Sequence, residues 1–186
     1  HYTSKSKTKD TIAPSSSFTI GSSTTGSNGW YKALTVQVNL SDNGSGVSSA
    51  KYCTTTGSTC TPNVDASISN NTFKVTLGSN ASAQRVCTQV TDVAGNTSST
   101  ICSGTYKVDT TNPTAKISAS SSGSNITVSA SGSSDAHSGI ASYQYSRNNS
   151  TWYTSTSNSY TFTGLSDGTY TVYVKITDKS GRVSGT

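Results

Sequence analysis

The sequence predicts an all-β chain folded as two tandem antiparallel β-sandwiches. Short runs in which Val, Ile, Tyr and Thr alternate with other residues are separated by Gly, Asn, Asp and Ser, the pattern of strands and turns. No window shows sustained helical periodicity. Hydrophobic residues make up only 30% of the 186 residues, so each core must be thin, and packed sheets suit such a core.

Internal repetition sets the domain boundaries. Residues 41–53 align without a gap with residues 134–146, and residues 86–98 align with residues 172–184. The joint Asp109-Thr-Thr-Asn-Pro113 resembles Asp10-Thr-Ile-Ala-Pro14. We therefore predict a strand over residues 1–9, a first domain over 10–108 and a second over 109–186.

The turns explain each repeated motif. Asp42 and Asp135 can accept hydrogen bonds from the amides of their own turns, and Gly46 and Gly139 supply positive φ. Asp and Gly recur three residues apart in the second repeat, across a tight hairpin. The expected strands are 17–21, 34–40, 50–55, 72–77, 83–91 and 100–108 in the first domain, and 115–119, 125–130, 141–146, 151–154, 159–162 and 169–177 in the second.

Alternation assigns the faces of these strands. Tyr170, Val172, Val174 and Ile176 point one way and form core, as do Val86, Thr88 and Val90 by alignment. Cys87 is then expected to face outward. We expect Tyr52 and Tyr145 to fill the two cores.

The joint DTTNPT, the turns SDNGSGV and SDAHSGI, and the segments VCTQVTDVAGNTS and YTFTGLSDGTYTVYVKITDKSGRVS resemble tandem bacterial Ig-like (fibronectin-III-like) domains of secreted surface proteins and adhesins. The resemblance covers nearly the whole chain. It implies Ig-like sandwiches, an extracellular location on a bacterial cell surface, and a structural role in a stalk or filament. The alternative it implies is an adhesin-type module that recognises a glycan or a host protein.

The four cysteines all lie in the first domain, and their even number indicates an oxidising compartment. We favour the pairs Cys53–Cys60, around a short loop, and Cys87–Cys102, across a hairpin. Cys53–Cys87 is the rival pairing. A zinc site is not expected, because there is no CxxC spacing or supporting His.

Composition also argues against several function classes. The net charge of +5 comes from scattered basic residues apart from Lys5, Lys7 and Lys9, and no aromatics interleave with these to form a nucleic-acid site. No stretch is apolar enough for membrane insertion. Catalysis is not expected, because there are two histidines, no Glu, no GxSxG motif and no forced pair of carboxylates.

The sequence predicts no cofactor. If a metal binds, it is calcium, held near the joint by Asp109, Asn112, Asp135 and Asp178, with Asp42 and Asp92 as alternatives to the last two. Turn hydrogen bonds explain each Asp more simply. If a glycan or host protein binds, Trp152 and Tyr153 are the candidate surface aromatics, although most second-domain aromatics are better explained as core.

The partners expected are flanking Ig-like domains or other copies of the chain, arranged head to tail. The second domain has only nine residues after Thr177, too few for a complete final strand. By its parallel with residues 100–108, the segment Tyr2-Thr3-Ser4-Lys5-Ser6-Lys7-Thr8-Lys9 is expected to complete a neighbouring domain, in a covalent array or as a donor strand between separate subunits.

Overall fold

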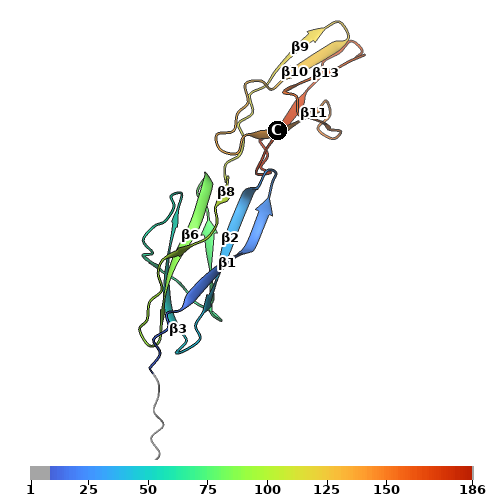
Figure 1. Cartoon of the computed structure of the whole chain (residues 1–186). Coiled ribbons are helices and arrows are strands. Elements are labelled where there is room, and N and C mark those ends of the chain that lie inside the picture. The colour runs from blue at the N-terminus through green and yellow to red at the C-terminus, as the bar shows by residue number, and fades with distance from the viewer. Residues whose placement is uncertain (1–8, 186) are drawn as a thin grey trace, which may run out of the picture. The chain divides into compact units, whose positions relative to one another are not determined.

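A computed structural model describes residues 9–185 and shows an all-β protein, as the sequence predicted. Figure 1 traces its strands along the chain. The described residues contain no helix, and so none that could span a membrane. The strands are β1 (Ser15–Thr25), β2 (Trp30–Ser41), β3 (Val47–Thr55), β4 (Val64–Asp65), β5 (Thr72–Leu77), β6 (Ala81–Asp92), β7 (Ile101–Cys102), β8 (Tyr106–Val108), β9 (Ser118–Ser122), β10 (Asn125–Ser129), β11 (Ile140–Ser146), β12 (Tyr153–Ser155), β13 (Ser159–Phe162) and β14 (Tyr173–Asp178).

The chain divides into two compact units. The first comprises the residues up to Ser23, Leu34–Leu77 and Ala83–Tyr106. The second comprises Thr24–Ala33, Gly78–Ser82 and the residues from Lys107 onward. The repeated sequence motifs fall one copy in each unit.

In the first sequence repeat, β2 pairs with β5 and β3 pairs with β6, both antiparallel. β8 pairs in parallel with the start of β2 and also neighbours β6, so it links the two groups of strands. Alternate residues on β2, β5 and β6 are buried because successive side chains on a strand point to opposite faces. The inward set includes Val36, Val38, Phe73, Val75, Val86 and Val90.

The second unit contains two three-stranded antiparallel sheets, β13-β10-β9 and β12-β11-β14. Tyr145 of β11 is fully buried between them, as predicted, and its hydroxyl donates to the Ser157 carbonyl at 3.0 Å. Burial is the main cause that raises the pKa of Tyr145 to about 12, and the electrostatic effect of the neighbouring Tyr143 adds to it. The rest of this core is Val128, Ala130, Phe162, Val174 and Ile176, with Val172 packed against it.

After β14, Val183 returns to Thr177 through an isolated bridge, and the described residues contain no further strand. The same bridge occurs in the first repeat between Thr97 and Thr91, but there β7 and β8 follow it.

Candidate functional site

The most distinctive polar feature is a group of three aspartates that occurs once in each unit. Asp10, Asp42 and Asp92 form the first-unit carboxylate cluster, and Asp109, Asp135 and Asp178 form the second-unit carboxylate cluster. Within each cluster, one carboxylate oxygen from each residue lies within 4.8 Å of the other two.

The first aspartate of each cluster opens a joint and ties it to the unit that follows. Asp109 Oδ1 accepts from the Thr111 amide at 3.0 Å, and Oδ2 accepts from the Ser138 amide at 3.0 Å. Asp10 does the same with the amides of Ile12, at 3.0 Å, and Ser45, at 2.6 Å. Each carboxylate therefore fixes its own turn and binds the Asp-to-Gly turn of its unit.

These hydrogen bonds set the charge state of the joint aspartates. Burial raises the pKa of Asp109, but hydrogen bonds from Ser138 and Thr111 outweigh it, and the pKa lies below its ordinary value. Hydrogen bonds from Ile12 and Ser45 lower the pKa of Asp10 in the same direction. Both groups are therefore anionic at neutral pH.

The second aspartate of each cluster organises the repeated turn. Asp42 Oδ2 accepts from the amides of Gly44, at 3.1 Å, and Gly46, at 2.7 Å. Asp135 Oδ1 accepts from the amides of His137, at 3.2 Å, and Gly139, at 2.6 Å. Gly46 and Gly139 have φ of 90° and 77°, the left-handed region predicted for them.

The third aspartate lies at the end of a core strand. Asp92 and Asp178 are 2% and 1% exposed. Asp92 Oδ1 accepts from the Asn96 amide at 2.7 Å, and Asp178 Oδ1 accepts from the Arg182 amide at 2.9 Å. The hairpin turn predicted from the Asp-to-Gly spacing thus uses the carboxylate as its anchor.

Of the calcium candidates, the structure brings the carboxylates of Asp109, Asp135 and Asp178 together. Asn112 is exposed and, in the described part of the chain, forms no hydrogen bond with these three aspartates. In the first-unit cluster, the sequence indicates Asp42 and Asp92 only as alternatives to Asp135 and Asp178, and it includes Asp10 only in a joint. The alignment of Asp10 with Asp109 was the signal that could have found the cluster.

The predicted aromatic pair is only partly available at the surface. Trp152 is half-buried, and Lys175 Nζ lies 4.0 Å from its ring centroid. Tyr153 is 42% exposed and stacks on Tyr160 with a centroid distance of 5.2 Å. A hollow of about 370 Å³ next to it is lined by Arg147, Asn148, Thr151, Tyr153 and Tyr170.

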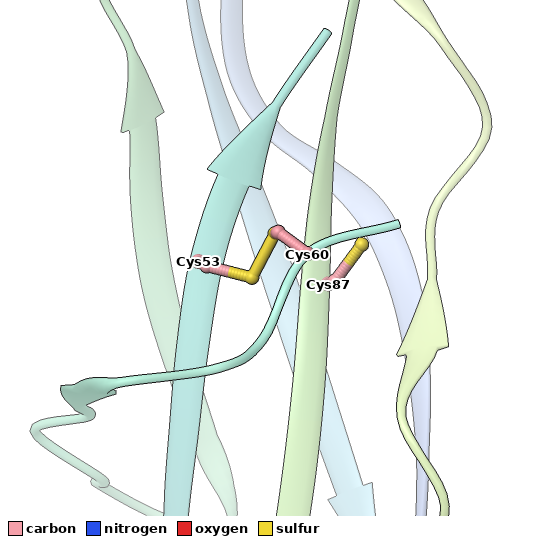
Figure 2. Close-up of side chains that lie close together, drawn as sticks. All are labelled: Cys53, Cys60 and Cys87. Atoms are coloured by element: carbon pink, nitrogen blue, oxygen red, sulfur yellow. A yellow bond between two sulfur atoms is a disulfide. The ribbon is translucent and has the colours of Figure 1, made fainter. Parts of the chain in front are cut away.

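The cysteines form the two favoured bridges, Cys53–Cys60 and Cys87–Cys102. Cys53 and Cys87 are nevertheless opposite each other on β3 and β6, and Figure 2 shows the Cys53–Cys60 bridge beside the Cys87 side chain. Cys87 lies on the face of β6 opposite Val86 and Val90, but it is fully buried rather than exposed. Its face of β6 is covered because Cys102 on β7 pairs directly with it and the loop before Cys60 approaches from β3.

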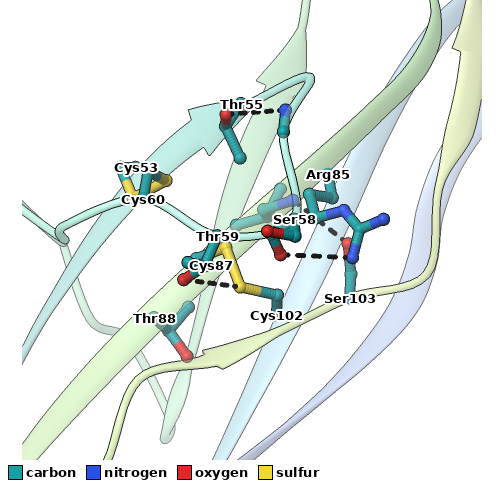
Figure 3. The surroundings of a disulfide bond; sticks show 12 residues. Cys53, Thr55, Ser58, Thr59, Cys60, Arg85, Cys87, Thr88, Cys102 and Ser103 are labelled. Carbon is teal, nitrogen blue, oxygen red and sulfur yellow. Dashed lines mark hydrogen bonds between the residues drawn. A yellow bond between two sulfur atoms is a disulfide. The ribbon is translucent and has the colours of Figure 1, made fainter.

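Polar contacts hold that loop over the hairpin (Figure 3). Cys102 Sγ lies 3.6 Å from Thr59 Oγ1, and Arg85 donates to the Ser58 carbonyl at 3.3 Å. The two disulfides therefore lie side by side on the sheet of β3, β6 and β7, and these polar contacts connect the loop of the first disulfide to the strands of the second.

Most of the predicted assembly strand lies outside the described residues. Tyr2, Thr3, Ser4, Lys5, Ser6, Lys7 and Thr8 are not described, and Lys9 is exposed. The pairing of this segment therefore stays a prediction.

Known proteins resemble this chain in part of its sequence and in its structure. The sequence family described as the Y_Y_Y domain matches residues 136–184, within the second unit. No curated protein sequence matches the chain. Among solved structures, fibronectin(III)-like modules of CbhA from Clostridium thermocellum are similar at 16% identity, with a TM-score of 0.43, over 91% of this chain and 90% of that one.

Proposed function

We propose that the chain is a non-enzymatic structural element of a bacterial surface stalk or filament, built from Ig-like modules arranged in series. The observation that carries the proposal is the duplicated joint. Asp10 and Asp109 each bind an amide two residues ahead and an amide of the Asp-to-Gly turn. A joint built twice by the same contacts is what a serial array requires, because every module must receive its predecessor in the same way.

The cysteines support an extracellular location. Two disulfides and no free cysteine among the described residues are typical of proteins from oxidising compartments. They also cross-link a unit with a small hydrophobic core, which is a common device in secreted domains.

Immunogold labelling tests this proposal in the bacterium that encodes the chain. Antibodies raised against residues 109–185 should label stalks or filaments on intact, unpermeabilised cells. Labelling confined to the cytoplasm of permeabilised cells would contradict both the location and the structural role.

The proposal includes head-to-tail continuation. The Tyr2–Lys9 segment corresponds in sequence to the segment of β7 and β8, which closes the first repeat by pairing with β6 and β2. We infer that it closes a preceding module, in the same polypeptide or in another copy. Deleting residues 1–9 should abolish head-to-tail assembly in a donor-strand filament; unchanged assembly and resistance to unfolding would exclude the donor-strand form.

A binding role is the second candidate, favoured by the hollow beside Tyr153 and Tyr170. Exposed aromatic faces beside polar groups can stack on sugar rings, and Tyr153 is the most exposed aromatic residue within residues 9–185. A glycan array probed with the full chain tests it, with Tyr153→Ala as the matched variant. Binding that Tyr153→Ala removes would establish an adhesin function, whereas binding unaffected by the substitution would place the ligand elsewhere.

A further inference from the structure

The second-unit carboxylate cluster has more acceptor oxygens than the protein satisfies. Asp178 is 1% exposed, and its Oδ1 accepts from Ser180 Oγ and the Arg182 amide, at 2.8 and 2.9 Å. Its Oδ2 is buried and has no hydrogen-bond partner. Asp135 shows the same division, because Oδ1 is bound by its turn while the buried Oδ2 has none.

Three carboxylates this close, with two of their buried oxygens unpartnered, are unfavourable, and a bound cation would offset both costs. Like charges repel at these distances, and a buried anionic oxygen without a donor loses its hydration without compensation. Both joint and turn hydrogen bonds hold these carboxylates in place, so they cannot simply turn to solvent.

The protein's own cations do not neutralise the cluster. Arg182 Nε donates to the main-chain carbonyl of Asp109 at 3.0 Å rather than to a carboxylate. Lys179 Nζ lies near Gly139, 3.5 Å from where a Cβ would stand there, and His137 is exposed. Within residues 9–185, none of these three forms an ion pair with Asp109, Asp135 or Asp178.

The first-unit carboxylate cluster provides an internal comparison. Asn96 occupies the position that aligns with Arg182, and its Nδ2 donates to Asp92 Oδ2 at 2.7 Å. The oxygen equivalent to the unpartnered Asp178 Oδ2 is therefore already satisfied in the first unit. Only Asp42 Oδ1 is buried without a partner there.

We propose that Asp109, Asp135 and Asp178 form a Ca²⁺ site in the second unit. The ligands are all hard carboxylate oxygens in an irregular arrangement set by turns, which Ca²⁺ accepts more readily than Mg²⁺ because its coordination is flexible. The ion would tie the joint, the Asp-to-Gly turn and the end of β14 together. The folded stability of the second unit would therefore depend on the Ca²⁺ concentration.

Isothermal titration calorimetry of the full chain, freed of metal with EDTA and dialysed, tests the site with CaCl₂. We expect one site with a dissociation constant of about 10⁻⁴ to 10⁻³ M, the range of extracellular calcium modules. At 10 mM CaCl₂ the folding equilibrium of the second unit should rise roughly 10- to 100-fold, measured by urea unfolding. MgCl₂ at the same concentration should do much less.

Asp178→Asn is the decisive variant, since its amide keeps an oxygen for Ser180 and Arg182 but loses the charge. It should weaken Ca²⁺ binding at least tenfold, while the matched first-unit variant Asp92→Asn should leave it unchanged. Asp135→Asn gives a second, independent test if Asp178→Asn does not fold. No heat and no stabilisation at 10 mM CaCl₂, an equal response to MgCl₂, or loss of binding in Asp92→Asn alone would each overturn the proposal.

Discussion

The two disulfides of the first unit should contribute unequally to its stability. We compare the double variants Cys87→Ala/Cys102→Ala and Cys53→Ala/Cys60→Ala. The first bridge spans 15 residues and the second spans seven. Because a cross-link stabilises mainly by restricting the unfolded chain, loop length alone gives about 3 kcal/mol for the first and about 2.3 kcal/mol for the second.

Burial enlarges the difference. Cys87 is fully buried on β6, so its replacement by Ala also leaves a small void under β7. Cys53 is 8% exposed and its partner Cys60 lies at the edge of the loop, where the chain can relax. We therefore expect Cys87→Ala/Cys102→Ala to be the more destabilising variant by at least about 1 kcal/mol.

Urea unfolding followed by hydrogen exchange and mass spectrometry measures the free energy of unfolding of β3 and β6 separately from the second unit. Peptides covering β11 and β14 serve as the control, since the second unit contains no cysteine. Equal stability of the two variants, or a larger loss from Cys53→Ala/Cys60→Ala, would refute the reasoning.

Three further perturbations follow from the described contacts. The fold lowers the pKa of Asp10 and of Asp109 from 3.8, so their contribution to the free energy of unfolding is present above about pH 4 and is lost as the pH falls through the folded values. Acid unfolding of the wild type and of Asp109→Asn checks this, and Asp109→Asn should lose stability less steeply as the pH falls. Tyr145 has its pKa raised from 10.0 to about 12, so stability should be complete below pH 10 and fall between pH 10 and 12, and Tyr145→Phe should lack that alkaline limb in a far-ultraviolet circular dichroism titration. Gly46→Ala should cost about 1–2 kcal/mol in thermal unfolding because φ is 90°, whereas Gly104→Ala, with free space and no positive φ, should cost less than half of that.

Alternation along the sequence was sufficient to predict the bounds of those strands that pair with a neighbouring strand along their whole length. Residues 72–77 and 159–162 were predicted with the bounds observed for β5 and β13. The strand predicted over 169–177 begins only at Tyr173, because β11 offers no partner beyond Ser146. β4 was not predicted, since a two-residue strand has no alternation to read.

The predicted strand over 100–108 is divided into β7 and β8, because the chain changes its partner. β7 pairs with β6, whereas β8 pairs with β2. Between them, Ser103 binds Val86 through both its amide and its hydroxyl, at 2.8 and 3.1 Å. Such a change of partner depends on where two sheets come together, which alternation in one segment does not encode.

The carboxylate clusters could be predicted in part. Repetition identified Asp109, Asp135 and Asp178 as residues of equivalent turns near a joint, and the structure brings them together. Which oxygen of each stays unpartnered depends on side-chain placement. Asn96 and Arg182 occupy equivalent positions, but only Asn96 donates its side-chain hydrogen bond to the third aspartate of its cluster. This difference is visible only in the structure.

Single-molecule force spectroscopy on a concatemer of the chain tests the structural role most directly. A load-bearing array predicts two classes of resolved unfolding event per copy. Reduction should lengthen only one class, by about 70–80 Å. The two disulfides together span sequence separations of 7 and 15, and the chain between the bridged cysteines then becomes extensible at up to about 3.6 Å per residue step. Unfolding without resolved force peaks, or a lengthening of both classes on reduction, would contradict the proposal that these units carry load in series.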